Sequence, residues 1–147
     1  MALFLSSFTN GIDTKGRISV PASFRAAVAA ENFGGIVLFR SFTNKCIEGF
    51  GMNRMEKMAA ATDQLGAFDK TQDDLTAMLF ADARPLQFDV SGRVVIPEDL
   101  LKHADISGEA VFVGRGNSFQ IWNPREFAKA QNESLARLQK SNPSLKI

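Results

Sequence analysis

Two short stretches of this chain place an aspartate four residues before an arginine, with a glycine directly before the arginine. Asp13 and Arg17 form the first pair, and Asp89 and Arg93 form the second pair 76 positions later. Arginine can bond a guanine edge bidentately or clamp a phosphate, and a two-stranded β-ribbon can carry it into the major groove of DNA. Alternatively, each arginine pairs with its own aspartate across a turn. Such a surface ion pair contributes only ~0–1 kcal/mol to stability.

A third cation accompanies the first pair but not the second. Lys15 lies between Asp13 and Arg17, and Ser91 occupies the matching position of the second copy. Lys15 is either a phosphate contact or a solvated turn residue, and the sequence favours neither. Arg25 and Arg40 could extend the same basic face, although such residues are more often simply exposed to solvent.

The two pairs belong to an internal repeat, which constrains the fold more than any single residue does. Residues 12–21 read IDTKGRISVP and residues 88–97 read FDVSGRVVIP, with Asp, Gly, Arg and Pro identical in a gapless alignment. Gly16 and Gly92 follow polar residues, as in a tight turn that needs one residue at positive φ. Apolar and polar residues then alternate as in a half-buried strand, and a proline takes the first position of a short helix. Each copy is expected to form strand, turn, strand and short helix.

Two apolar runs follow the short helix in each copy and predict a β-hairpin. The runs are residues 36–39 and 46–50 in the first copy and residues 110–113 and 118–122 in the second. The repeats therefore cover residues 5–51 and 83–126. A unit of this size cannot bury its apolar face well alone, so we expect the two repeats to pack on each other.

The segment between the repeats, residues 52–82, is rich in Met, Ala, Lys, Asp and Gln. Its apolar residues follow helical spacing and predict two helices with a break near residues 66–70, the second helix capped by Thr71. The methionines Met52, Met55 and Met58 are expected to serve packing or subunit contact.

A C-terminal helix and tail are expected over residues 127–147. Asn123 and Pro124 are typical of a helix start, and the helix is expected to end near residues 141–143. Its apolar face comprises Phe127, Ala130, Leu135 and Leu138.

Composition places the chain among compact globular proteins, with 45% hydrophobic and 22% charged residues in 147. A net charge of +1 neither favours nor excludes a polyanionic partner, so a nucleic-acid binder must gather its cations on one face. The apolar residues 1–8 are too short to span a bilayer and are expected to form a first strand. The single cysteine, Cys46, fits a reducing compartment and is expected to be a small buried hydrophobe.

The sequence shows no arrangement typical of catalysis or of cofactor binding. His103 has no Cys or His partner at metal-ligand spacing. Glu48, Asp63 and Glu109 show no paired-carboxylate spacing, and there is no glycine-rich phosphate loop. We expect no enzyme activity, metal, cofactor or small-molecule substrate.

Two Asp-x-x-x-Arg motifs, each in a Gly-Arg-apolar-x-apolar-Pro frame and joined by a helical insert, closely resemble the MraZ family. These bacterial transcriptional regulators are encoded at the head of the division and cell-wall gene cluster. The resemblance covers nearly the whole chain, including the trailing helix. It implies an α+β fold of tandem AbrB-like swapped-hairpin β-barrel repeats, as in the AbrB/MazE/SpoVT class, with one subunit corresponding to a pseudo-dimer.

The same resemblance implies a function. The family is regarded as forming a ring, here expected to be an octamer or larger, that represses its own operon from repeated boxes in double-stranded promoter DNA. The chain is accordingly expected in the cytoplasm, associated with the nucleoid and not with a membrane. DNA-binding residues are expected to be Arg17, Arg93 and Lys15, supported by Asp13, Gly16, Asp89 and Gly92.

Two alternatives of other classes stay open. An antitoxin-like module would bind DNA and also neutralise a protein partner through a long acidic tail, whereas the tail here is short and nearly neutral. A structural ring scaffold would bind no nucleic acid, and Arg17 and Arg93 would then matter only for folding.

Overall fold

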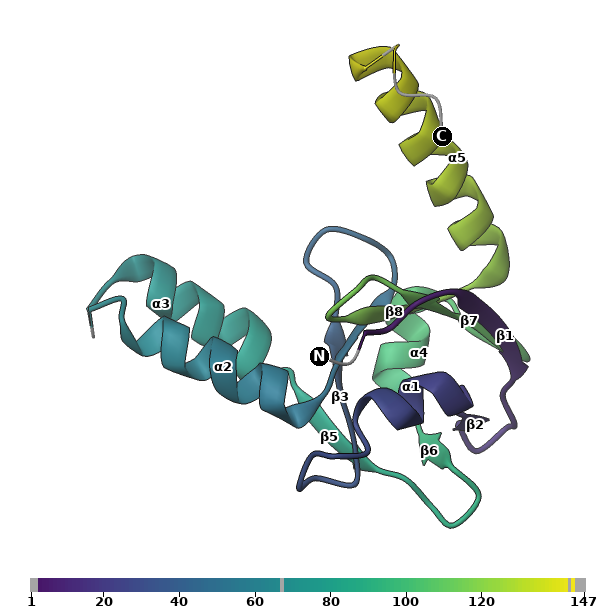
Figure 1. Cartoon of the computed structure of the whole chain (residues 1–147), viewed down its shortest axis with the longest axis horizontal. Coiled ribbons are helices and arrows are strands. Elements are labelled where there is room, and N and C mark those ends of the chain that lie inside the picture. Colours follow the sequence, from purple (N-terminus) through teal and green to yellow (C-terminus); the bar gives the residue numbers. More distant parts are fainter. Residues whose placement is uncertain (1–2, 67, 143, 145–147) are drawn as a thin grey trace.

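The computed structural model describes residues 3–66, 68–142 and 144, and it has an α+β architecture (Figure 1). The first repeat contains β1 (Ser7–Gly11), β2 (Arg17–Ser19), α1 (Ala22–Ala27), β3 (Gly35–Arg40) and β4 (Ile47–Phe50). The second repeats this order with β5 (Arg84–Gln87), β6 (Arg93–Val95), α4 (Glu98–Ala104), β7 (Glu109–Gly114) and β8 (Phe119–Trp122). The predicted unit of strand, turn, strand, short helix and hairpin is therefore present twice.

Strands of the two repeats pair with each other in both sheets. The six-stranded antiparallel sheet has the order β1-β7-β8-β4-β3-β5, so β1 pairs with β7 and β5 pairs with β3. At its centre β4 pairs with β8, and the separate two-stranded sheet joins β2 to β6. Exchanging the two repeats gives the same strand order, read from the opposite edge of the sheet. The prediction that the repeats pack on each other is confirmed.

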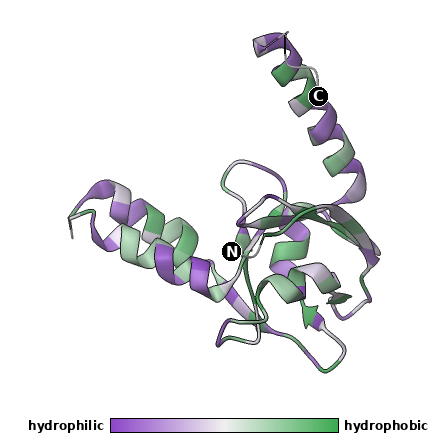
Figure 2. Cartoon of the chain, viewed as in Figure 1, coloured by the Kyte–Doolittle hydropathy of each residue, from purple (hydrophilic) through white to green (hydrophobic). Residues whose placement is uncertain are grey.

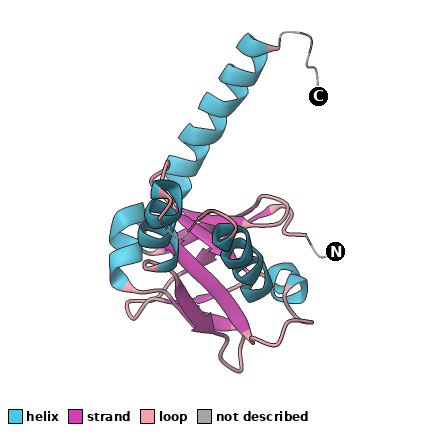
Figure 3. Cartoon of the chain, turned by 90° about the vertical axis from the view of Figure 1, so that its left-hand side faces the viewer, coloured by secondary structure: helices cyan, strands magenta, loops and turns pink. Residues whose placement is uncertain are grey.

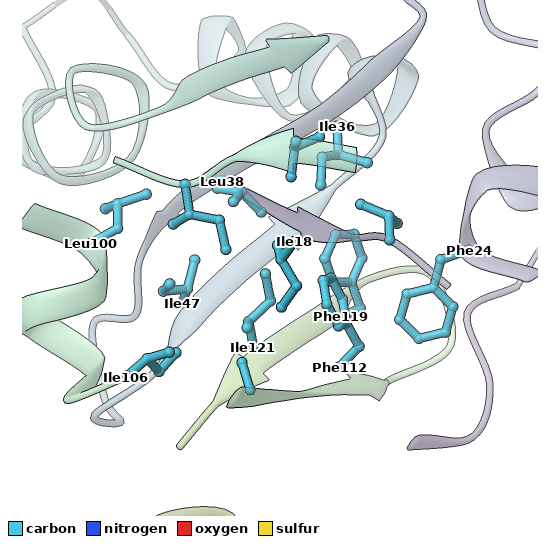
Figure 4. Packing of buried hydrophobic residues seen from close by; sticks show 14 of the residues in the cluster. Ile18, Phe24, Ile36, Leu38, Ile47, Leu100, Ile106, Phe112, Phe119 and Ile121 are labelled. Atoms are coloured by element: carbon cyan, nitrogen blue, oxygen red, sulfur yellow. The ribbon is translucent and has the colours of Figure 1, made fainter. Parts of the chain in front are cut away.

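The main core lies between the large sheet, the β2–β6 ribbon and the two short helices (Figure 4). Phe24 of α1 is fully buried, and its ring contacts those of Phe4, Phe112 and Phe119 at centroid distances of 5.3, 6.1 and 5.3 Å. Leu100 occupies the equivalent place on α4 and is also fully buried. These side chains fix the short helices against the sheet and thereby fix the ends of the ribbon.

The insert between the repeats forms a helical hairpin of α2 (Met52–Asp63), α3 (Lys70–Leu75) and a π-helical turn η1 (Thr76–Phe80). It covers a second core on the outer side of β3 and β4, where Val37, Phe39 and Phe50 meet Met55 and Leu79. Successive residues of β3 thus enter different cores, as the period of two in a strand requires. The prediction that the methionines serve packing is confirmed for Met55, which is buried.

The C-terminal helix α5 (Pro124–Ser141) projects well beyond the sheet (Figure 3). The side chain of Asn123 accepts hydrogen bonds from the backbone N–H groups of Arg125 and Glu126, and Pro124 is the first helical residue. The predicted start and end of this helix are confirmed. Within the described residues, no helix is both long enough and apolar enough to cross a bilayer.

Three local predictions are wrong. The second insert helix is capped by Asp69, not Thr71, because the Asp69 carboxylate accepts from the backbone N–H groups of Thr71 and Gln72. The first strand spans Ser7–Gly11 and so shares just Ser7 and Phe8 with the predicted residues 1–8, whereas Phe4 forms an isolated bridge to Gly116. Residues 1–2 lie outside the described residues. Pro21 and Pro97 precede the short helices as caps instead of occupying their first helical position.

Candidate nucleic-acid interface

The β2–β6 ribbon brings the two predicted arginines onto one exposed surface. Ile18 pairs directly with Val94, and both side chains are buried in the main core. The neighbouring positions, Arg17, Ser19, Arg93 and Val95, therefore lie on the opposite, solvent-facing side. Arg17 and Arg93 are diagonal neighbours across the ribbon, and such neighbours have Cα atoms roughly 7–8 Å apart. Their side chains are 41% and 39% exposed.

The turn before β2 is organised by one aspartate. Oδ1 of Asp13 accepts hydrogen bonds from the backbone N–H groups of Lys15 and Arg17, each at 2.9 Å. Oδ2 accepts from Nε of Arg17 at 2.7 Å, and the N–H of Gly16 donates to the Asp13 carbonyl at 3.0 Å. Gly16 has φ +84°, and a Cβ there would lie 2.7 Å from the carbonyl oxygen of Ile96. The motif therefore needs aspartate and glycine for its own geometry.

The turn before β6 repeats this arrangement. Asp89 accepts from the backbone N–H groups of Ser91 at 2.8 Å and Arg93 at 3.0 Å, and from Nε of Arg93 at 3.0 Å. The N–H of Gly92 donates to the Asp89 carbonyl at 3.0 Å, and Gly92 has φ +76°. Because the ribbon strands are antiparallel, the two turns lie at its opposite ends.

Each arginine is thus paired with its aspartate and still presents donors to solvent. Only Nε is engaged by the carboxylate, and within the described residues the two Nη atoms of Arg17 and of Arg93 make no hydrogen bond. The aspartate orients the guanidinium group, and the outer edge of the guanidinium, which carries the two Nη atoms, remains free. Such an edge can bond two acceptors at once, either on a base or on a phosphate.

The carboxylates that hold the arginines are stabilised in their charged form. The pKa of Asp13 is lowered below 3.8, first by the backbone hydrogen bond from Arg17, and the pKa of Asp89 is lowered in the same way by the N–H of Arg93. A lowered folded-state pKa adds stability above the unfolded value of about 3.9, and this is lost only as pH falls through the lowered value. Both turns are therefore expected to keep their geometry throughout the neutral and mildly acidic range.

The three remaining predicted cations lie at three different places. Lys15 is exposed at the tip of the first turn, and no ion pair of its side chain occurs among the described residues. Arg25 lies beside the second turn, where its Nε donates to the carbonyl of Val20 at 3.1 Å. Arg40 lies at the end of β3 and is bound by Asp82, so it belongs to a structural network instead of the ribbon surface.

That network joins the insert to both repeats and was not found from the sequence. Asp82, the last residue of the insert, accepts from Arg40 Nη2 at 2.6 Å and Arg84 Nη2 at 3.2 Å. Arg84 in turn donates to both carboxylate oxygens of Asp99 at 2.9 and 2.7 Å. Hydrogen bonds from Arg84 lower the pKa of Asp99 to about 2. No local spacing could reveal contacts between residues as far apart as Arg40 and Asp82.

Replacing Asp82 with alanine is expected to lower the free energy of unfolding by roughly 1–3 kcal/mol, because two guanidinium groups lose their shared acceptor. The loss stays below that of a fully buried pair because the Arg40 side chain is 47% exposed. Urea unfolding followed by circular dichroism measures it. Asp73→Ala is the matched control, since within the described part of the chain Asp73 forms an ion pair just with the exposed Lys70, and its loss should change stability by less than ~0.5 kcal/mol. Equal effects of the two substitutions would contradict this account of the network.

Catalytic candidates do not gather at the ribbon. Cys46 is fully buried, and burial raises the pKa of its thiol to about 12, which confirms the prediction of a buried hydrophobe. His103 lies in α4 at the other end of the helix from Pro97. Across the described residues no three His, Cys, Asp or Glu side chains are placed to hold a metal ion.

The structure is that of a duplicated α+β protein with an Asp–Gly–Arg turn at each end of a shared ribbon. The matching family model is described as "MraZ protein, putative antitoxin-like", and it matches residues 3–77 and 79–145. A protein of Rickettsia peacockii named "Transcriptional regulator MraZ" is 42% identical over 132 residues, covering 90% of this chain and 89% of its own. A protein of the same name from Rickettsia canadensis is 40% identical over 134 residues, covering 91% and 90%. The chain therefore belongs to the MraZ family.

Proposed function

We propose that this chain is a sequence-specific DNA-binding transcriptional regulator that represses the division and cell-wall gene cluster, including its own operon. One observation carries the proposal: two aspartate-held guanidinium groups lie on the same exposed face of a two-stranded ribbon. Arg17 and Arg93 bond guanine edges or phosphates from this face, and Lys15 contacts the backbone. The names of the relatives support regulation of transcription. The protein then acts in the cytoplasm at the nucleoid.

The fold is proposed to be the swapped-hairpin barrel of the AbrB-like class. In support, the outer strands β1 and β5 each pair with a strand of the other repeat, and the ribbon takes one strand from each repeat. One chain then supplies both halves of a DNA-reading unit that needs two motif copies. The two arginines are fixed relative to each other within one molecule.

The regulator is proposed to work as a ring of identical subunits, an octamer or larger, in which α5 of one copy docks on the insert of the next. Leu135 and Leu138 on α5 are 54% and 50% exposed, and α5 stands clear of the sheet along most of its length (Figure 2). An open groove of about 310 Å³ lies between α2 and β5, and apart from Glu56 it is lined by apolar residues: Val37, Met52, Met55, Ala59, Phe80, Ala83 and Pro85. A helix with an apolar face fits such a groove.

Charge supports a second copy as the occupant of that groove. Residues 52–82 carry six acidic and three basic side chains, whereas residues 124–141 carry four basic and two acidic ones. The helix and the groove belong to different parts of the surface, so their contact is head-to-tail and closes into a ring if the rotation allows. Linking several ribbons over repeated promoter boxes raises affinity by roughly 10²–10⁴ through effective concentration.

Binding of the wild-type protein to DNA from directly upstream of its own gene tests the proposed function. Fluorescence anisotropy should give tight binding that weakens steeply with salt, and a shuffled sequence of the same composition should bind far more weakly. Equal affinity for both DNAs would contradict sequence-specific reading. No binding at low salt would favour the structural scaffold.

Replacing Leu138 with glutamate is expected to break the ring into smaller species and to weaken binding to DNA with several boxes by roughly 10²–10⁴. Light scattering measures the mass, and anisotropy measures the affinity. Ala136→Glu adds the same charge on the opposite side of α5 and should leave both unchanged. The docking proposal fails if Leu138→Glu keeps the wild-type mass.

A further inference from the structure

The two DNA-reading turns are related by the repeat but are not chemically equal. The first carries Asp13, Lys15 and Arg17 and so has a net charge of +1, whereas the second carries Asp89 and Arg93 with Ser91 between them and is neutral. A neutral turn attracts phosphate poorly, since the sequence-independent part of DNA affinity comes from unpaired cations. The second turn therefore needs a cation from elsewhere if both ends of the ribbon are to hold the DNA backbone.

Arg25 of α1 supplies a guanidinium at this place. A Cβ at Gly92 would lie 2.7 Å from Nε, 2.8 Å from Cζ and 2.9 Å from Cδ of Arg25, so the side chain lies directly against the second turn. Nε donates to the carbonyl of Val20 at 3.1 Å, and the N–H of Val20 donates to the Gly92 carbonyl at 3.1 Å. The guanidinium is thus anchored where β2 passes the turn.

Arg25 has no acidic partner among the described residues. Its side chain is partly exposed, and no carboxylate in the described part of the chain pairs with it. Because Nε is held by a carbonyl, the group keeps its full positive charge and both Nη atoms for an external acceptor.

At the other end of the ribbon, the described residues place no guanidinium against Gly16. The position equivalent to Arg25 in the second repeat is Leu101 on α4, and the nearest atoms to a Cβ at Gly16 are backbone atoms of Ile96. Each turn therefore has one extra cation, contributed by the turn itself at one end and by the neighbouring helix at the other.

We propose that Arg25 is the phosphate-binding residue of the second turn and does there what Lys15 does in the first. The inference rests on the proposed DNA-binding function and extends it to a residue outside both motifs. It accounts for a serine at position 91, where the first turn carries Lys15. It also predicts that the two ends of the ribbon contact the DNA backbone with similar strength despite their different sequences.

Anisotropy titrations of the full-length protein on its own upstream DNA, over a range of salt concentrations, test this. Arg25→Leu installs the residue of the other repeat and is expected to weaken binding roughly threefold to tenfold for each contacting subunit. The slope of the logarithm of the binding constant against the logarithm of the salt concentration should also become shallower by about 1 per subunit, equally for specific and shuffled DNA. Arg25→Lys should retain the slope because it retains the charge. Lys57→Leu removes one exposed cation from α2, far from the ribbon (Figure 1), and should change neither quantity.

Arg25→Gln keeps a polar side chain and tests the charge if Arg25→Leu does not fold. Wild-type affinity and salt slope in both neutral variants, with the wild-type protein binding its DNA, would overturn the role of Arg25 and leave the proposed function intact. A wild-type protein that binds no DNA even at low salt would overturn both. Weaker binding with an unchanged salt slope would assign Arg25 to packing against Gly92 and would also overturn the phosphate role.

Discussion

Replacing both Arg17 and Arg93 with alanine is expected to abolish specific binding to the upstream DNA while the protein stays folded and assembled. Each bidentate contact to a base contributes roughly 1–3 kcal/mol, so losing two lowers the affinity of one ribbon by about 30-fold to 10⁴-fold. Folding should survive because the affected ion pairs are surface pairs of ~0–1 kcal/mol. Titration of the upstream DNA measures sequence-specific binding, and titration of a shuffled sequence measures binding that depends on charge alone. Comparing the two separates the loss of sequence recognition from the loss of positive charge.

The conservative variant sharpens this prediction. Arg17→Lys keeps the charge but cannot form the planar bidentate pair, so it should retain binding to shuffled DNA and lose preference for the specific sequence. Mass and thermal unfolding are measured on the same samples. Unchanged affinity in the assembled double variant would contradict the role of the ribbon. Loss of the folded state would assign both arginines to their turns, as a scaffold requires.

Replacing Phe24 with alanine is expected to lower the free energy of unfolding by roughly 3–5 kcal/mol, the largest stability effect we anticipate. The ring is fully buried, and four other phenylalanines lie within contact range, with Phe8 at a centroid distance of 5.7 Å in addition to the three in the main core. Removing it leaves a cavity at the point where α1 fixes the end of β2. Because α1 also carries Arg25, loosening it should weaken DNA binding as well.

Phe68→Ala provides the matched control for this substitution. The Phe68 side chain is fully exposed, so its removal should change stability by no more than about 0.5 kcal/mol. Urea unfolding monitored by circular dichroism compares the two variants with the wild type. A similar small effect at Phe24 would contradict the assignment of this residue to the centre of the core.

The local units of the fold could be predicted from the sequence because their determinants are local. The Asp–x–x–Gly–Arg spacing encodes a complete turn, with the aspartate accepting the backbone N–H groups two and four positions later. The alternation after Gly16 fixes which side chains face the core, and Asn123 with Pro124 fixes the start of α5. In each case the residues that cause the structure are neighbours in the chain.

Contacts between distant segments could not be predicted in this way. A repeat does not specify whether β1 pairs within its own copy or with β7 of the other, so cross-repeat pairing is a property of the whole chain. The cap of α3 was misassigned because Asp69 and Thr71 are both good caps, and only the backbone path decides between them. The approach of Arg25 to Gly92 depends on the packing of α1 from one repeat beside the turn of the other.

Site-specific crosslinking from the outer face of the ribbon tests the central claim most directly. Val95 pairs with Arg17 in the ribbon, and its side chain is 53% exposed. Val95→Cys can carry a thiol-linked photoreactive group, because the native Cys46 is fully buried and its pKa is raised to about 12. Phe68→Cys, on the exposed loop between α2 and α3, is the control position. We expect Val95→Cys to crosslink the upstream DNA and Phe68→Cys not to. Crosslinking from Phe68→Cys alone, with the tagged Val95→Cys protein still binding DNA, would show that another surface reads the DNA.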